Sequence, residues 1–169
     1  MRVYRFSRSG FSIIEMLVAL VVIAILVGVA LAVGRQVLNT SRRELTYGEV
    51  KSLMGAEQWV VHKTAGTVPG SMYSFLVAYQ QLHAYQDAGG VWRMRSNMLT
   101  RLPPSMVKTS LVPMPNGGNM LMITQVNDAW GNAIQFLPTV FYNSHAPCFV
   151  SAGQDGMFGT ADDIHSYDP

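Results

Sequence analysis

The sequence has little charge and almost no cysteine. Asp, Glu, Lys and Arg make up 13 % of its 169 residues, about half of the usual share, and the formal net charge is only +2. A net charge this small produces only a weak electrostatic field, and the basic residues are scattered along the chain. Both observations argue against a nucleic-acid-binding protein. The single cysteine, Cys148, excludes an intramolecular disulfide and a cysteine metal cluster. If the chain is exported, something other than a disulfide must stabilise its loops.

The sequence also lacks the patterns that mark common active sites. Its four histidines show no metal-ligand spacing, and there is no glycine-rich phosphate loop or nucleophile elbow. His145 and Cys148 are close in sequence, but a catalytic pair also needs a third, orienting group. Cys148 follows a proline and begins a strand-like run, which favours a buried, unreactive thiol. We therefore expect no enzymatic activity.

Apolar residues are abundant instead, at 49 %, and they are concentrated in residues 11–33. As a helix rising about 1.5 Å per residue, this segment would be about 34 Å long, enough to cross a bilayer core of about 30 Å. Three arginines precede it and no comparably dense cluster follows, so the positive-inside rule places the N-terminus in the cytoplasm. The sequence thus predicts a single-pass membrane protein in contact with lipid.

Two ways of processing this segment are open. Residues 30–32, ALA, form an acceptable site for ordinary signal peptidase, which would release everything downstream. The alternative is cleavage between Gly10 and Phe11, which Glu15 supports. Inserting a carboxylate into the membrane costs about 2.5–3.5 kcal/mol at a helix centre, so Glu15 needs a partner. The alternative is that the Glu15 side chain extends to the lipid headgroups from the first turn of an ordinary membrane anchor. Cleavage would create an α-amino group on Phe11, and pairing it with Glu15 between staggered copies would fix the register of a polymer.

Residues 10–20, GFSIIEMLVAL, resemble the processing site of type IV prepilins and type II secretion pseudopilins. The resemblance implies cleavage after Gly10 by a prepilin peptidase of the inner membrane. It also implies methylation of the new N-terminal residue, Phe11, and a role for Glu15 in assembly.

The same resemblance implies three parts and a set of partners. The parts are a cleaved leader (residues 1–10), a transmembrane and polymerisation segment (11–34) and a periplasmic globular domain (35–169). The partners are further copies of the chain in a helical polymer, other pseudopilins and the inner-membrane assembly platform.

Downstream of the apolar segment, the sequence predicts an α+β fold. Helix-favouring residues continue without proline to about Lys63, so a long N-terminal helix is expected. Residues 73–85 predict a short helix that covers the core. Strands are predicted for three short runs, residues 120–126, 133–142 and 148–151. Because these runs are closely spaced, the sheet should be antiparallel and packed on the second half of the long helix, a pilin-like arrangement.

Residues 128–132, DAWGN, predict a tight turn. An aspartate such as Asp128 can accept hydrogen bonds from nearby backbone amides, and Gly131 can adopt a positive φ. We expect Trp130 to pack over the core, because a lone tryptophan is far more often a packing residue than a ligand platform.

Residues 151–164 concentrate carboxylates and glycines in one loop. Asp155, Asp162 and Asp163 are candidate ligands for a hard cation, and calcium is the natural candidate. A solvated acidic loop without metal is the alternative. An Asp-Trp-Gly turn followed by a glycine-rich loop with paired aspartates resembles the C-terminal half of major type II secretion pseudopilins, in which this loop binds calcium.

The leading hypothesis is therefore the major pseudopilin of a type II secretion system, a homopolymer subunit whose growth would move exported proteins. One alternative is a type IV pilin or a minor pilin-like subunit. An alternative of another class is a secreted, calcium-stabilised binding domain released after Ala32. Residues 70–118 match no pattern that would decide between these hypotheses.

Overall fold

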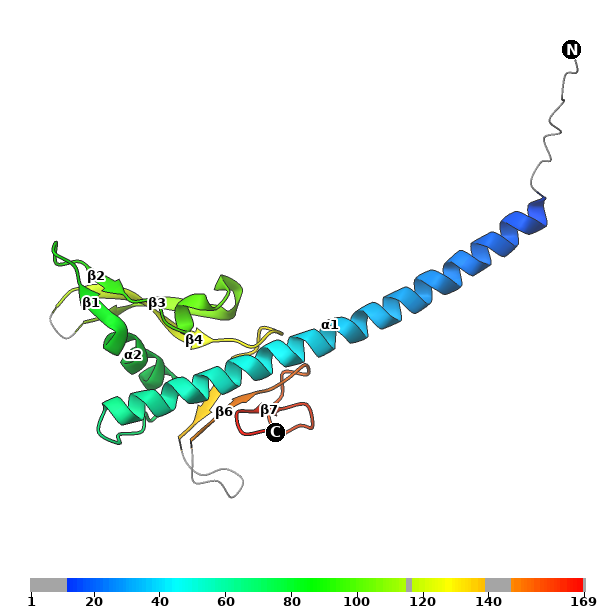
Figure 1. Cartoon of the computed structure of the whole chain (residues 1–169). Coiled ribbons are helices and arrows are strands. Elements are labelled where there is room, and N and C mark those ends of the chain that lie inside the picture. Colours follow the sequence, from blue (N-terminus) through cyan, green and yellow to red (C-terminus); the bar gives the residue numbers. More distant parts are fainter. Residues whose placement is uncertain (1–11, 115–116, 139–146, 169) are drawn as a thin grey trace, which may run out of the picture. The chain divides into compact units, whose positions relative to one another are not determined.

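The computed structural model describes residues 12–114, 117–138 and 147–168. It divides into two units, Met1–Thr40 and Ser41–Pro169, whose elements are shown in Figure 1. The predicted α+β class is confirmed, because one long N-terminal helix is followed by small antiparallel sheets.

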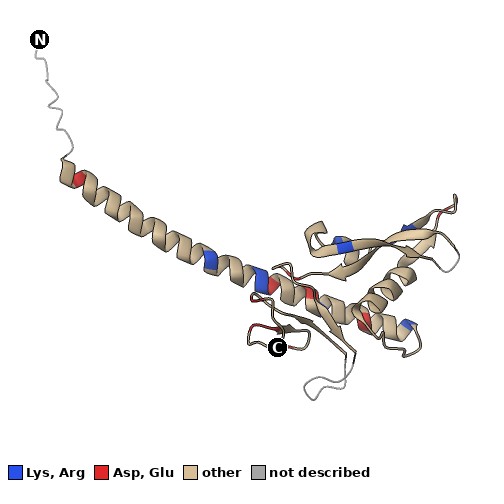
Figure 2. Ribbon diagram, turned by 180° about the vertical axis from the view of Figure 1, so that it is seen from behind, with Lys and Arg blue, Asp and Glu red and all other residues tan. Residues whose placement is uncertain are grey.

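Within the first unit, the described residues form the beginning of helix α1, which extends over Ile13–Lys63. This stretch has no core of its own, since its apolar side chains are exposed; Ile13 is 82 % exposed and Leu26 63 %. Residues 16–34 contain no charged residue, and the helix is correspondingly tan after its first red residue in Figure 2. A helix surface of this kind requires an apolar environment outside the chain.

In the second unit, α1 ends at Lys63, as predicted. Ala65 and Gly66 adopt positive φ angles of 55° and 88°. The Gly66 N–H donates to the Val61 carbonyl oxygen at 2.8 Å. This arrangement satisfies a backbone carbonyl that the last turn would leave free, and it terminates the helix.

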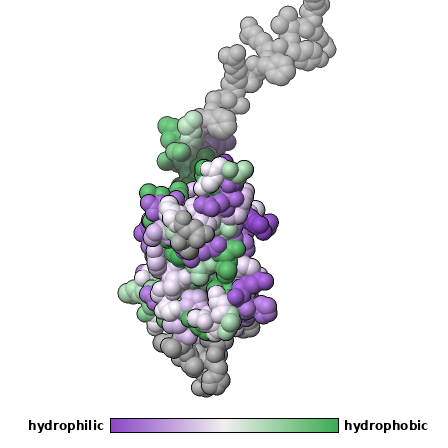
Figure 3. Space-filling view, turned by 90° about the vertical axis from the view of Figure 1, so that its left-hand side faces the viewer, coloured by the Kyte–Doolittle hydropathy of each residue, from purple (hydrophilic) through white to green (hydrophobic). Residues whose placement is uncertain are grey.

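The main core lies where the second half of α1 meets α2, Met72–His83. Helix α2 confirms the short helix predicted for this region. The cluster draws buried residues from α1, from α2 and from the following segments: Val50, Leu53, Ala56, Val60, Phe75, Leu76, Tyr79, Leu99, Val126, Ile134, Phe136 and Phe149. Polar and apolar residues are interspersed on the surface of this unit in the view of Figure 3.

The strands are antiparallel, as predicted, but they form three small sheets instead of one. They pair as β1 (Ala84–Gln86) with β2 (Trp92–Met94), β3 (Val107–Pro113) with β4 (Asn119–Val126), and β5 (Gln135–Leu137) with β6 (Cys148–Ser151), which also pairs with β7 (Ile164–His165). Two short 3-10 helices, η1 (Leu99–Arg101) and η2 (Pro104–Met106), precede β3.

Two of the three predicted strands are confirmed, at β4 and β6. The strand predicted for residues 133–142 is shorter within the described part of the chain. It begins as β5 at Gln135 and ends at Leu137, because the next residue is Pro138, which has no amide to donate to a ladder. Residues 139–142 lie outside the described residues.

One buried side chain ties the β3–β4 hairpin to α2. Gln80 is 1 % exposed, and its Nε2 donates to the carbonyl oxygens of Leu76 and Ile123 at 2.9 and 2.6 Å. Its Oε1 accepts a hydrogen bond from the Ile123 N–H at 2.8 Å. Gln80 therefore satisfies both backbone groups of a β4 residue.

Candidate functional site

Helix α1 begins with a reciprocal cap formed by Ser12 and Glu15. The Ile14 N–H donates to Ser12 Oγ at 3.3 Å, and the Ser12 N–H donates to Glu15 Oε2 at 3.1 Å. The glutamate half of this cap follows the capping-box pattern, whereas Ser12 Oγ bonds the amide two residues later instead of three. Glu15 thus has a partner within its own chain. The predicted cleavage site, Gly10 and Phe11, lies outside the described residues.

The helix that carries Glu15 is long and apolar enough to cross a membrane, and it is the only such helix within the described residues. The apolar window is not buried in the rest of the chain. It therefore differs from the core helix of a soluble protein, whose apolar residues would be covered.

The turn at residues 128–132 forms as predicted. Asp128 is 1 % exposed, and its Oδ1 accepts hydrogen bonds from the backbone N–H groups of Trp130 and Asn132 at 3.0 and 2.8 Å. Gly131 has a φ of 96°. Asp128 Oδ2 also accepts a hydrogen bond from Ser151 Oγ at 2.6 Å, so the turn is fixed to the start of the acidic loop.

Within the acidic loop, residues 151–164, Asp162 holds two segments together. Its Oδ1 accepts a hydrogen bond from Thr160 Oγ1 at 2.7 Å, and its Oδ2 accepts one from the Asp155 N–H at 3.1 Å. The Thr160 hydroxyl, followed by backbone amides, lowers the pKa of this carboxyl group. Gly153 has a φ of 63°, and a Cβ there would overlap the carbonyl oxygen of Asp162, so a side chain cannot be accommodated.

Asp163 has one carboxylate oxygen that the protein itself does not satisfy. Its Oδ2 accepts a hydrogen bond from the Gly159 N–H at 2.7 Å, whereas its Oδ1 is buried with no hydrogen-bond partner among the described residues. A buried carboxylate oxygen without a partner is costly unless a cation or a proton satisfies it. The donor set of carboxylates and loop carbonyls suits calcium.

The three predicted ligands do not by themselves complete a site. Among the residues described, no three His, Cys, Asp or Glu side chains are grouped so as to hold a metal ion. A calcium ion in this loop would therefore have to be bound largely by backbone carbonyl oxygens, with fewer than three of these aspartates. The loop fits such a ligand set, since it contains three glycines that adopt positive φ, Gly153, Gly156 and Gly159.

Comparison with known proteins bears on the N-terminal segment. Residues 5–31 match the family described as the prokaryotic N-terminal methylation motif. The chain carries a prepilin-type methylation motif. Together with the apolar start of α1, the motif indicates a membrane-anchored, type IV pilin-like precursor, and it implies processing by a prepilin peptidase and assembly into pilin-like polymers. No curated protein and no solved structure matches the chain.

The methylation motif includes Glu15 and the beginning of α1. The cap formed by Ser12 and Glu15 and the uncharged stretch that follows it therefore belong to the matched segment. The family match supports the resemblance that residues 10–20 suggest, and it does not extend to the turn at residues 128–132 or to the acidic loop.

Sequence reasoning missed two buried carboxylates on α1, because both residues read simply as helix formers. Glu57 is 3 % exposed, and its Oε1 has no hydrogen-bond partner among the described residues. Glu49 Oε2 is buried and unpartnered in the same way. Burial, followed by the charge of Asp128, raises the pKa of Glu49 to about 7. Burial also raises the pKa of Glu57.

Cys148 is 1 % exposed and forms no disulfide. Burial raises the pKa of its thiol, which leaves little reactive thiolate at neutral pH. The prediction of a buried Cys148 is confirmed. His145, which was weighed as its possible partner, lies outside the described residues.

Proposed function

We propose that this chain is the structural subunit of a pseudopilus, which polymerises through α1 and assists protein export by type II secretion. The observation that carries this proposal is the methylation motif, whose single acid, Glu15, is followed by an exposed and uncharged stretch of α1, residues 16–34. The exposed apolar residues of α1 can be covered by lipid before assembly and by the helices of other copies after it, as a polymerising membrane subunit requires.

In this proposal, a prepilin peptidase of the inner membrane removes residues 1–10 and Phe11 becomes the methylated N-terminus. The protein is then a single-pass inner-membrane protein with a periplasmic globular domain, residues 35–169. Its role is mechanical and not catalytic. Growth of the polymer on an inner-membrane platform, together with other pseudopilins, would push exported proteins outwards.

We further propose that calcium binds the acidic loop and stabilises the globular domain. The unpartnered, buried Oδ1 of Asp163 supports this assignment. When bound, the ion would neutralise these carboxylates and fix the loop, as a disulfide does in other exported domains. Of the candidates Asp155, Asp162 and Asp163, one or two would hold it together with backbone carbonyl groups.

The mutation Glu15→Ala tests the assembly mechanism. It should leave processing and membrane insertion intact, because a carboxylate in an apolar helix opposes insertion. It should abolish filaments, because the amino group on Phe11 of the neighbouring copy would then be buried without a counter-charge. Glu15→Leu should insert still better and equally fail to polymerise. The matched control is Glu44→Ala, which removes an exposed carboxylate from the same helix outside the apolar segment.

Filaments are counted by electron microscopy in cells that express the complete assembly machinery. Normal filaments from Glu15→Ala would show that this carboxylate does not set the register. The two alternative functions give different results. A type IV pilin or minor pilin-like subunit predicts neighbouring genes for a pilus system in place of a secretion system. A secreted domain predicts a soluble mature chain that begins at Val33.

A further inference from the structure

A groove of about 570 Å³ runs beside α1 in the second unit. One wall belongs to α1 and the other to the segment around η1, with buried Leu53 and Val126 between them. The remaining lining residues are Leu45, Gly48, Glu49 and Ser52 on α1, and Asn97, Met98, Arg101 and Leu102 on the opposite wall. We call this feature the Glu49 groove.

Glu49 gives the groove its chemical character. The Oε2 atom of Glu49 is buried without a hydrogen-bond partner in the described part of the chain. The nearby carboxylate of Asp128 repels its charge, and Asp128 itself is occupied by the turn. Arg101 lines the opposite wall, yet the ion pair recorded among the described residues joins Arg93 to Asp87 instead. The groove therefore presents a carboxylate that a cation from outside the chain would neutralise.

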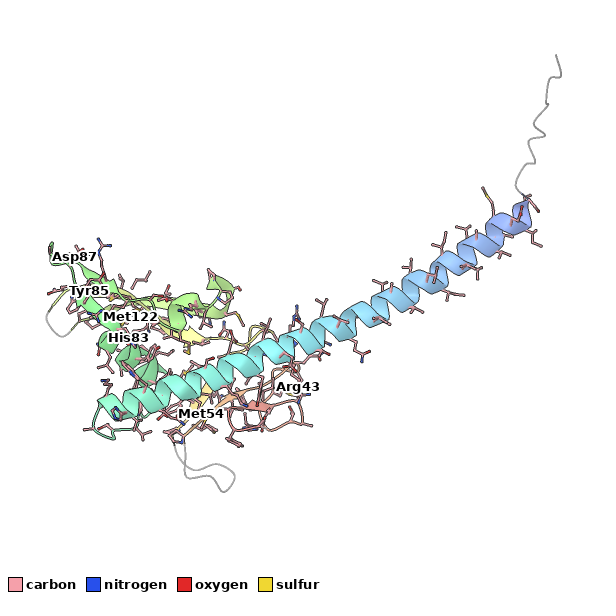
Figure 4. The ribbon with its side chains drawn as sticks, viewed as in Figure 1. Arg43, Met54, His83, Tyr85, Asp87 and Met122 are labelled. Atoms are coloured by element: carbon pink, nitrogen blue, oxygen red, sulfur yellow. The ribbon has the colours of Figure 1, made fainter. Side chains whose placement is uncertain are left out.

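Arg43 is such a cation, and it is placed on another side of the same helix. It is exposed, belongs to α1 (Figure 4), and forms no ion pair within the described residues. At about 100° per residue, Arg43 lies about 120° from Glu49 and about 180° from Ser52 around the helix axis. A side chain on this other side of the helix points away from the groove of its own chain, but it can enter that of a neighbouring copy.

We propose that the Glu49 groove of one copy receives Arg43 of the next copy, so that the two form an ion pair between subunits. This inference rests on the proposed function, since it requires a polymer. A contact between two different faces of one helix is heterologous, and repeating it produces an open filament instead of a closed dimer. The guanidinium group suits this site because it can donate several hydrogen bonds to a partly buried carboxylate.

Glu49 and Arg43 are six residues apart on α1, which corresponds to a displacement of about 9 Å along the axis between parallel helices. The proposed contact therefore predicts that neighbouring copies are staggered by about this distance.

Charge exchange in the full-length chain tests this inference. Glu49→Arg and Arg43→Glu should each reduce the number of filaments at least about tenfold, because like charges then meet at the interface. The double variant, Glu49→Arg with Arg43→Glu, should restore filaments. Arg95→Glu makes the same change of charge on a segment outside the groove, and it should leave filament numbers within about twofold of the wild type.

The Glu49→Arg variant could lose filaments because it misfolds. Cysteine cross-linking tests the same contact without introducing a charge into the groove. With Glu49→Cys and Arg43→Cys in one chain, oxidation of assembled filaments should produce a ladder of covalent multimers. Each single cysteine variant should not, since the native Cys148 is buried. A double cysteine variant that forms filaments without a ladder would overturn the proposed contact.

The controls separate this inference from the function on which it rests. Rescue of Glu49→Arg by Arg101→Glu, but not by Arg43→Glu, would assign the carboxylate to an intramolecular partner and overturn the proposal. If both single charge variants form as many filaments as the wild type, the proposed contact is overturned, while the proposed function is unaffected. Absence of any polymer from the wild-type chain in the complete system would overturn the proposed function as well.

Discussion

Replacing Glu49 by glutamine should change how the stability of the monomer depends on pH. In the folded chain, burial and the charge of Asp128 raise the pKa of Glu49 from its ordinary 4.5 to about 7. Between these two values the folded protein holds a proton that the unfolded chain has released. The free energy of unfolding should therefore fall as the pH rises from about 4.5 to about 7, and then level off.

The size of the effect follows from the same two pKa values. A rise from 4.5 to about 7 corresponds to at most about 3 kcal/mol, at about 1.36 kcal/mol per pH unit. Because Glu49 retains partial contact with solvent, we expect about 1–2 kcal/mol. Glutamine is neutral at every pH, so Glu49→Gln should match the wild type near pH 4 and exceed its stability by this amount near pH 8.

The assay is thermal unfolding of the full-length chain in detergent, followed by tryptophan fluorescence at several pH values. The variant should melt several degrees above the wild type near pH 8. The control is Glu44→Gln, an exposed site on the same helix, where the difference should be negligible. If the two chains lose stability in parallel between about pH 4.5 and 7, the reasoning about Glu49 is wrong.

Three further predictions concern other parts of the chain. Intact-mass measurement should show a mature protein that begins at methylated Phe11, and a chain beginning at Val33 would contradict the prepilin processing. Calcium at about a hundredfold excess over its dissociation constant should add about 2.7 kcal/mol of stability, seen as a higher Tm than in chelator, and Asp162→Ala should remove most of this difference. If protein shown to be metal-free at the start melts at the same temperature with calcium and with chelator, the loop does not bind calcium. Gln80→Leu should cost about 2–4 kcal/mol, because both backbone groups of Ile123 lose a partner; an unchanged Tm would show that water replaces the amide.

The sequence predicted the elements whose signals are local. The end of α1 at Lys63 follows from a long proline-free stretch and a glycine shortly after it, and the structure places it there. The turn around Asp128 was equally predictable, because an aspartate and a glycine three residues later favour one conformation. Strand β6 is buried at every position, and its short apolar run is the corresponding signal.

The elements that the sequence could not predict depend on contacts made elsewhere. Strand β3 exposes most of its residues, so it has no alternating apolar pattern, and its pairing with β4 determines where it lies. The buried state of Glu57 was also unpredictable, because a glutamate favours helix in any surroundings and only the packing of the other elements covers it. For the acidic loop, composition indicated the three aspartates, but only the fold distinguishes the satisfied Asp162 from the unpartnered oxygen of Asp163.

The cap between Ser12 and Glu15 also affects how stable an unassembled subunit would be in the membrane. In the single chain, Glu15 already accepts a hydrogen bond from the Ser12 amide, so its carboxylate is not bare while the subunit diffuses in lipid. Joining the proposed polymer would exchange this neutral donor for the charged amine of a neighbour, which is the stronger partner. Leaving the polymer would restore the cap. The same carboxylate would thus favour addition at the growing end and still allow released subunits to be used again.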